Sequence, residues 1–234
     1  MGSMETEQFW YNDVMVDSIL LHGILLTEDA GSGERADAAA NRVRLLQAAE
    51  QLFAERGVAN VSMADIAKTA GVGKGTLYRR FAHKGELCLA LMDSQFRDFQ
   101  NVILGRLRQM TMTDVPMLHQ LNQFLDALVY FNADHMLLLC EVQHSGIPAD
   151  ENTAPYFWQH LTVQGLLRGA VAAGELSPDL DVELLADVVL APLRPQSFRF
   201  LREQRGFELD RISAGIQSFV TNLGRGCQEH PAAR

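Results

Sequence analysis

The sequence predicts an all-α fold in two parts, a small N-terminal domain of three helices followed by a larger helical domain. Three observations lead to this prediction. From about residue 41 onward, apolar residues recur every three or four positions, which is the period of an α-helix, and no convincing strand-like alternation is found. Capping residues, glycines and prolines divide this pattern into separate helices. A hydrophobic fraction of 47% and a charged fraction of 21% are those of an ordinary globular protein.

The residues before this periodic part are expected to form an N-terminal extension and a linker, over residues 1–40. The first four resemble a tag-derived start followed by a native methionine. Residues 9–26 place apolar triplets five residues apart, which suits a helix buried on all sides, a poorly ordered segment or a stretch outside the functional protein. Residues 28–40 are rich in Gly, Ala, Ser and Asp, and this composition is typical of a linker.

The small domain is predicted from local signals. Gly57 ends the first helix as a left-handed residue just past its C-terminus. Ser62 and Asp65 have the spacing of a capping box and begin a second helix that reaches about residue 70. Gly71 lies where a tight turn needs a left-handed backbone, and a third short helix covers residues 74–81. The second and third helices can pack across this turn, as in a helix-turn-helix, through four apolar residues: Ile66, Ala70, Val72 and Leu77.

The larger domain is predicted to begin with a long amphipathic helix from about residue 84 to residue 110. Pro116 fits the first turn of the next helix, where its missing N–H is not needed. Pro192 and Pro195 should bend the helix in which they lie. The remaining helices are expected at four places: residues 133–145, 154–173, 181–204 and 208–225.

The charge of the chain is unevenly distributed. The net charge of −9 argues at first sight against a nucleic-acid partner. Residues 42–84, however, hold eight basic and three acidic residues, a local net charge of +5. Because salt screens charges beyond about 8–10 Å at physiological ionic strength, a basic face can bind phosphates beside an acidic remainder.

The cysteine pattern and the apolar segments bear on the compartment. Three cysteines lie far apart and form no CxxC pair, which indicates a reducing compartment without a disulfide framework; they are Cys88, Cys140 and Cys227. Residues 14–26 form an apolar stretch that lacks a basic flank and is interrupted by polar residues. It is therefore expected to be neither a signal peptide nor a membrane span. We expect a cytoplasmic protein with no membrane partner.

The third helix of the small domain carries the functional signal. Leu77 and Phe81, four residues apart, point back to the core. The outer face then presents Lys74, Gly75, Thr76, Tyr78, Arg79 and Arg80. This helix is the second of the two that form the helix-turn-helix. In such a motif the second helix enters the major groove of DNA.

Residues 42–91, above all DIAKTAGVGKGTLYRRFAHKGELC, resemble the DNA-binding domain of the TetR family of bacterial regulators. The resemblance implies an Ω-shaped, all-α homodimer that binds double-stranded DNA at a palindromic operator. It implies a DNA-binding domain over residues 41–84 and an effector-binding and dimerisation domain over residues 85–234. The last two long helices would pair with those of the partner in a four-helix bundle.

The resemblance also implies roles for individual residues. Lys74, Gly75, Thr76 and Arg79 occupy positions that face bases or the groove wall, and Ser62, Tyr78, Arg80 and Lys84 occupy positions that meet phosphates. Two residues depart from the family pattern. Ala64 stands where many members have a polar or basic residue, and Gly73 replaces a frequent serine cap.

A metal site and an enzyme are weaker alternatives. Glu141 and His144 form the Glu-x-x-His pattern of a di-iron helix bundle, but such a site needs a second copy that this sequence lacks. Cys140 and His144, one helical turn apart, would need His135 or His160 to complete a metal sensor. No Ser-His-Asp, P-loop or Rossmann pattern is found, so we expect no catalysis and no cofactor.

Two classes of regulator remain open. The first is a repressor released by a small apolar or aromatic effector, and its pocket candidates are Phe124, Phe131, His135, Cys140, His144 and Trp158. The second is a DNA-binding regulator without a small ligand, controlled by its abundance or by a protein partner. A sizeable cavity in the larger domain would favour the first class, and a filled core would favour the second.

Overall fold

The computed structural model describes residues 32–145 and 154–228, which form two compact units. The head unit contains residues 32–97 and 135–145. The body unit contains residues 98–134 and 154–228. The described residues contain α-helices and short 3-10 and π turns but no β-strand, which confirms the all-α prediction.

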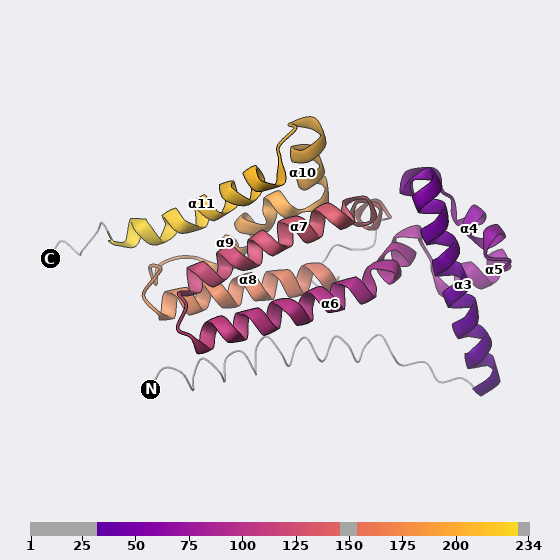
Figure 1. The fold of residues 1–234 in the computed structure, drawn as a ribbon, viewed down its shortest axis with the longest axis horizontal. Coiled ribbons are helices and arrows are strands. Elements are labelled where there is room, and N and C mark those ends of the chain that lie inside the picture. Colours follow the sequence, from indigo (N-terminus) through magenta and orange to yellow (C-terminus); the bar gives the residue numbers. More distant parts are fainter. Residues whose placement is uncertain (1–31, 146–153, 229–234) are drawn as a thin grey trace. The chain divides into compact units, whose positions relative to one another are not determined.

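The head unit is built on α3 (Ser32–Arg56), which is followed by the 3-10 turn η2 (Val58–Asn60), α4 (Met63–Thr69) and α5 (Lys74–Arg80) (Figure 1). It also contains the first half of α6 (Lys84–Met112) and the last turns of α7 (Met117–His144). One apolar core joins α3, α4, α5 and α6, and its most deeply buried members are Leu45, Ala49, Leu52, Ile66, Ala67, Leu77 and Leu87.

Two glycines shape the connections in this unit as the sequence predicts. Gly57 has a φ of 78° at the end of α3, and Gly71 has a φ of 65° between α4 and α5. Residues with a Cβ rarely adopt this left-handed conformation. The turn after α4 closes when the Val72 N–H donates to the Ala67 carbonyl, at 2.9 Å.

Helix α3 begins earlier than the sequence predicts. Residues 32–40 are helical and continue into the rest of α3, so the linker expected over residues 28–40 is wrong for this part. The segment contains several alanines, and alanine has the highest helix propensity of all residues. Residues 1–31, which hold the rest of the expected extension and linker, lie outside the described residues.

The body unit contains the remaining parts of α6 and α7 together with α8 (Ala154–Ala172), α9 (Val182–Leu190), α10 (Pro195–Arg199) and α11 (Leu209–Gln228) (Figure 1). The prolines break the helix predicted over residues 181–204. Pro192 lies in the 3-10 turn η3 (Ala191–Leu193), and Pro195 begins α10, which continues into a π-helical turn (Phe200–Gln204).

The segment predicted as two helices is one helix in the structure. One helix is expected to start near Pro116 and a further one to cover residues 133–145, whereas α7 runs without interruption from Met117 to His144. The segment contains no glycine or proline that would end a helix. In the described parts of the chain, no helix combines the length and apolar character that crossing a membrane requires.

Candidate nucleic-acid interface

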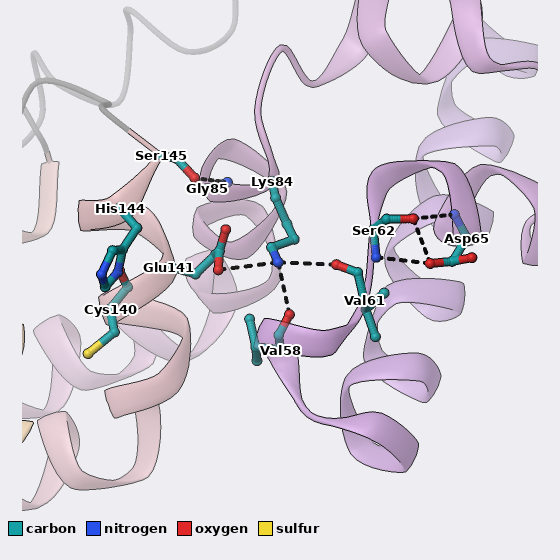
Figure 2. Close-up of polar contacts among 10 residues, drawn as sticks. All are labelled: Val58, Val61, Ser62, Asp65, Lys84, Gly85, Cys140, Glu141, His144 and Ser145. Carbon is teal, nitrogen blue, oxygen red and sulfur yellow. Dashed lines mark hydrogen bonds and ion pairs between the residues drawn. The ribbon is translucent and has the colours of Figure 1, made fainter.

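The first helix of the helix-turn-helix is fixed at its start by Ser62 and Asp65. The Ser62 hydroxyl accepts a hydrogen bond from the Asp65 backbone N–H at 3.2 Å, and the Asp65 carboxylate accepts one from the Ser62 backbone N–H at 3.0 Å (Figure 2). This is the predicted capping box. The Ser62 hydroxyl also donates to the same carboxylate at 2.5 Å. These hydrogen bonds to Ser62 hold the pKa of Asp65 below its ordinary value.

The second helix of the helix-turn-helix, α5, presents a cationic outer face. Leu77 is fully buried and Phe81 nearly so, which anchors the inner side of the helix in the core. The exposed residues are Lys74, Gly75, Tyr78, Arg79 and Arg80, whereas Thr76 is half-buried. Tyr78 is 51% exposed, so it is not a core aromatic. The structure therefore leaves these residues of α5 at least partly accessible, outside the side of the helix that packs into the core.

Gly73 is the N-cap residue of α5, and it offers no side-chain hydrogen bond to the helix. A serine or threonine at this position would provide one. The α5 N-terminus instead keeps its backbone contacts, in which the Thr76 and Leu77 N–H groups donate to the Gly73 carbonyl at 3.0 and 3.1 Å.

Lys84, the first residue of α6, lies in an internal network. Its ammonium donates to the carbonyls of Val58 at 2.9 Å and Val61 at 3.1 Å, and it lies 3.3 Å from the Glu141 carboxylate (Figure 2). Only 15% of the Lys84 side chain is exposed. An ammonium has three N–H donors, and the three oxygens match that number. This placement departs from the expectation that Lys84 meets phosphate.

The partners of Lys84 are not visible in the sequence pattern. Two of them are backbone carbonyls, which any residue supplies, so no side-chain pattern indicates them. The third partner, Glu141, stands in the sequence as part of a Glu-x-x-His pattern, which suggests a metal ligand.

A second contact lies beside this network. The Gly85 backbone N–H donates to the Ser145 hydroxyl at 3.0 Å, so the first turn of α6 is also bonded to the residue that follows α7 (Figure 2). Cys88, Val58 and Val142 form a small apolar cluster in the same unit. Burial, together with the nearby Glu141 carboxylate, raises the pKa of the Cys88 thiol to about 12.

The six pocket candidates are divided between the two units. Phe124, Phe131 and Trp158 belong to the body unit, whereas His135, Cys140 and His144 belong to the head unit. In the body unit the Phe124 and Trp158 rings meet edge to face at 5.5 Å between centroids. All three aromatic side chains are buried. They fill the core at this point.

The histidines expected to be polar pocket contacts have partners inside the head unit. His135 Nε2 lies 2.7 Å from the Gln95 side-chain oxygen, and His144 Nδ1 lies 2.6 Å from the Cys140 carbonyl. Among the described residues, no three His, Cys, Asp or Glu side chains gather in a way that could hold a metal ion.

The body unit has a small pocket and an open apolar groove. The pocket, about 130 Å³, is lined by residues of α6 and α7 that include Arg106, Met110 and Phe124. The groove is larger, about 420 Å³, and lies over α9, the π-helical turn and α11. Its lining includes Val188, Pro192, Ile216 and Phe219.

A polar cluster in the body unit was also missed by the sequence analysis. The Tyr156 hydroxyl donates to Asp187 at 2.7 Å, and the Arg194 guanidinium donates to the Tyr156 oxygen at 2.7 Å. His160 Nε2 lies 3.7 Å from the other Asp187 oxygen. Burial and the hydrogen bond to Asp187 raise the pKa of Tyr156 to about 12. These residues come from α8, α9 and the start of α10, so sequence spacing did not connect them.

Comparison with known proteins agrees with this geometry. Residues 45–91 match the family described as bacterial regulatory proteins, tetR family. An HTH-type transcriptional regulator from Staphylococcus aureus (strain MRSA252) is 31% identical over 177 residues, which cover 75% of this chain and 90% of the relative. The chain belongs to the TetR family. It is therefore a helix-turn-helix transcriptional regulator, as the sequence analysis predicts.

Solved structures share the fold of this TetR-family regulator. The fatty acid degradation regulator FadR from Bacillus halodurans aligns with a TM-score of 0.57 at 18% identity, covering 83% of this chain and 97% of its own. FadR from Bacillus subtilis, solved in complex with stearoyl-CoA, aligns with a TM-score of 0.57 at 17% identity, covering 76% of this chain and 97% of its own. At these identities the likeness establishes the fold.

Proposed function

We propose that this TetR-family regulator is a repressor that binds a palindromic operator as a homodimer and leaves it when a mainly apolar ligand binds. The observation that carries the DNA-binding part is the outer face of α5, where four cationic or hydroxyl-bearing side chains are exposed beside Gly75: Lys74, Tyr78, Arg79 and Arg80. Promoter DNA lies in the bacterial cytoplasm, so we place its action there.

Within this proposal, Lys74 and Arg79 read bases, because both side chains can donate to guanine O6 and N7. Gly75 and Thr76 lie against the groove wall. Tyr78 and Arg80 bind phosphates, which fixes the position of the helix on the duplex. The Ser62 hydroxyl donates a hydrogen bond to the Asp65 carboxylate, so a phosphate at this position would compete with that carboxylate for the hydroxyl donor.

The dimer is supported by the apolar groove over α9 and α11. Leu184, Val188 and Phe219 are 61%, 45% and 44% exposed, respectively, on these two helices. An exposed apolar patch of this kind marks an interaction surface. In the proposed dimer a second copy covers it with the same helices, in keeping with the family resemblance. Sedimentation velocity should give a dimer for the wild type and a monomer for Val188→Glu, and a monomeric wild type would refute the dimer.

The effector class is supported by the aromatic core of the body unit and by the fold shared with a FadR that was solved with stearoyl-CoA. A pocket of about 130 Å³ is smaller than the roughly 300–1,000 Å³ typical of ligand sites. The proposed ligand therefore has to displace side chains such as Phe124, which lines this pocket. A filled core is also what the ligand-free class of regulator would show, so the test has to separate the two classes.

The test is a pair of titrations with stearoyl-CoA and lauroyl-CoA as probes. DNA affinity is measured with and without each probe, and probe affinity with and without operator. If the ligand releases the repressor, both titrations give the same coupling factor, because coupling between two binding equilibria is reciprocal. Probes that bind without changing DNA affinity would refute release by a ligand of this kind and favour the ligand-free class, whereas probes that do not bind would exclude these two acyl-CoA molecules as effectors.

A further inference from the structure

Two contacts join the start of α6 to the end of α7, and two more join it to the segment before α4. The first two are the Lys84 ion pair with Glu141 and the hydrogen bond from Gly85 to Ser145. The other two are the Lys84 hydrogen bonds to the carbonyls of Val58 and Val61, and none of the four involves the outer face of α5. Figure 2 shows the Lys84 nitrogen between the Glu141 carboxylate and the two carbonyls.

The two carbonyls lie immediately before the helix-turn-helix. Val61 precedes Ser62, the N-cap of α4, and Val58 begins η2. An ammonium that donates to both carbonyls fixes the segment from which α4 starts. Its third partner, Glu141, belongs to the last turn of α7, so the same side chain fixes this segment against α7.

We propose that Lys84 and Glu141 are positioning residues, which hold the helix-turn-helix on the end of α7 in the orientation that binds DNA. Lys84 then acts on DNA binding through the backbone of residues 58 and 61 and not through a phosphate. Glu141, an acidic residue in a DNA-binding unit, then favours DNA binding. This inference rests on the proposed DNA-facing role of α5.

The burial of the pair explains why its loss should matter. Only 15% of the Lys84 side chain and 20% of the Glu141 side chain are exposed. Removing one partner of such a pair leaves the other charge poorly compensated, whereas a fully exposed pair contributes little. The helix-turn-helix would then spend part of its time in other orientations. The apparent dissociation constant rises as the competent fraction falls.

The two roles of Lys84 predict opposite effects of Glu141→Gln. If Lys84 bound a phosphate, neutralising Glu141 would free the ammonium and strengthen DNA binding. If Lys84 positions the head unit, Glu141→Gln weakens DNA binding. Glu50→Gln is the matched control, since Glu50 is an exposed acid on α3 in the same unit and the change in charge is identical.

Ser145→Ala provides a variant without any change in charge. It removes the oxygen that accepts the Gly85 N–H, so in the positioning account it also weakens DNA binding. If DNA affinity depended only on the charge of the head unit, Ser145→Ala would bind DNA as tightly as the wild type. Because the side chain becomes smaller and Ser145 is only half-buried, the variant is expected to fold.

The experiment measures operator affinity by fluorescence anisotropy at several salt concentrations, together with the alkylation rate of Cys88. We expect Glu141→Gln to bind operator DNA about three- to tenfold more weakly than Glu50→Gln. We expect Ser145→Ala to bind it more weakly than the wild type by about the same factor. The salt slope should stay within half a unit of the wild-type value, since no phosphate contact is lost. Cys88, which is fully buried beside the pair, should be alkylated faster in both variants.

The positioning role is overturned if Glu141→Gln binds DNA as tightly as Glu50→Gln or more tightly. It is also overturned if Lys84→Met lowers the salt slope by about one unit, the loss expected for one phosphate contact. A wild type that binds no DNA would instead refute the proposed function, and this outcome is read from the wild-type titration alone.

Discussion

Gly75→Ala is predicted to stabilise the fold and to weaken DNA binding. Gly75 lies in α5 without a positive φ, and a methyl group placed on it meets no heavy atom within 4 Å. The substitution therefore adds neither strain nor a clash inside the protein. What remains is the gain in helix propensity, about 0.5 kcal/mol near a helix end, which raises the melting temperature by roughly 1–2 °C.

The same methyl group would project from the exposed face of α5 toward DNA. If the backbone at Gly75 approaches the groove wall, the added group pushes the helix outward and weakens operator binding about tenfold, or about 1.4 kcal/mol. Gly105→Ala is the control, since Gly105 is exposed on α6 and a methyl group there also meets nothing within 4 Å. Thermal denaturation measures the stability of both variants, and anisotropy titration measures their operator affinity. Operator affinity equal to wild type in Gly75→Ala would refute the proposed orientation of α5.

Three further predictions test the turn, the base contacts and the polar cluster of the body unit. Gly71→Ala should destabilise the protein by about 1–2 kcal/mol in denaturant unfolding, because its φ of 65° disfavours a Cβ although no atom obstructs one. Arg79→Ala should reduce the preference for the operator over scrambled DNA by about 1–3 kcal/mol in competition titrations. An unchanged preference would mean that Arg79 does not contact bases. Tyr156 should ionise near pH 12 in an ultraviolet titration of wild type against Tyr156→Phe. Because its folded pKa is raised above the ordinary value of about 10, the stability it contributes is present below pH 10 and is lost as the pH rises toward 12.

The head unit could be predicted in detail because its signals are local. Gly57 and Gly71 adopt the left-handed backbone that the turns require, and Ser62 forms the expected capping box with Asp65. The exposed face of α5 follows from the burial of Leu77, since the opposite side of a short helix then faces outward. Each of these features depends on residues a few positions apart.

The pocket candidates show what local signals leave undetermined. Phe124 and Cys140 lie on the same helix, α7, and the sequence analysis places them in one pocket. A helix of 28 residues, however, is about 42 Å long, so its two ends can belong to different units. Aromatic and polar residues along one helix therefore need not meet. The partners of Lys84 cannot be predicted for a related reason, because they lie far from it along the sequence. Val58 precedes Lys84 by 26 residues, and Glu141 follows it by 57.

The central claim is that the outer face of α5 reads DNA in a symmetric dimer. In vitro selection from a random-sequence duplex pool, followed by sequencing of the bound fraction, tests it most directly. The account predicts an enriched inverted repeat whose half-site centres lie about one helical turn, roughly 34–36 Å, or a multiple of it apart. An enriched site without dyad symmetry, or a bound pool with no enriched sequence, would contradict it.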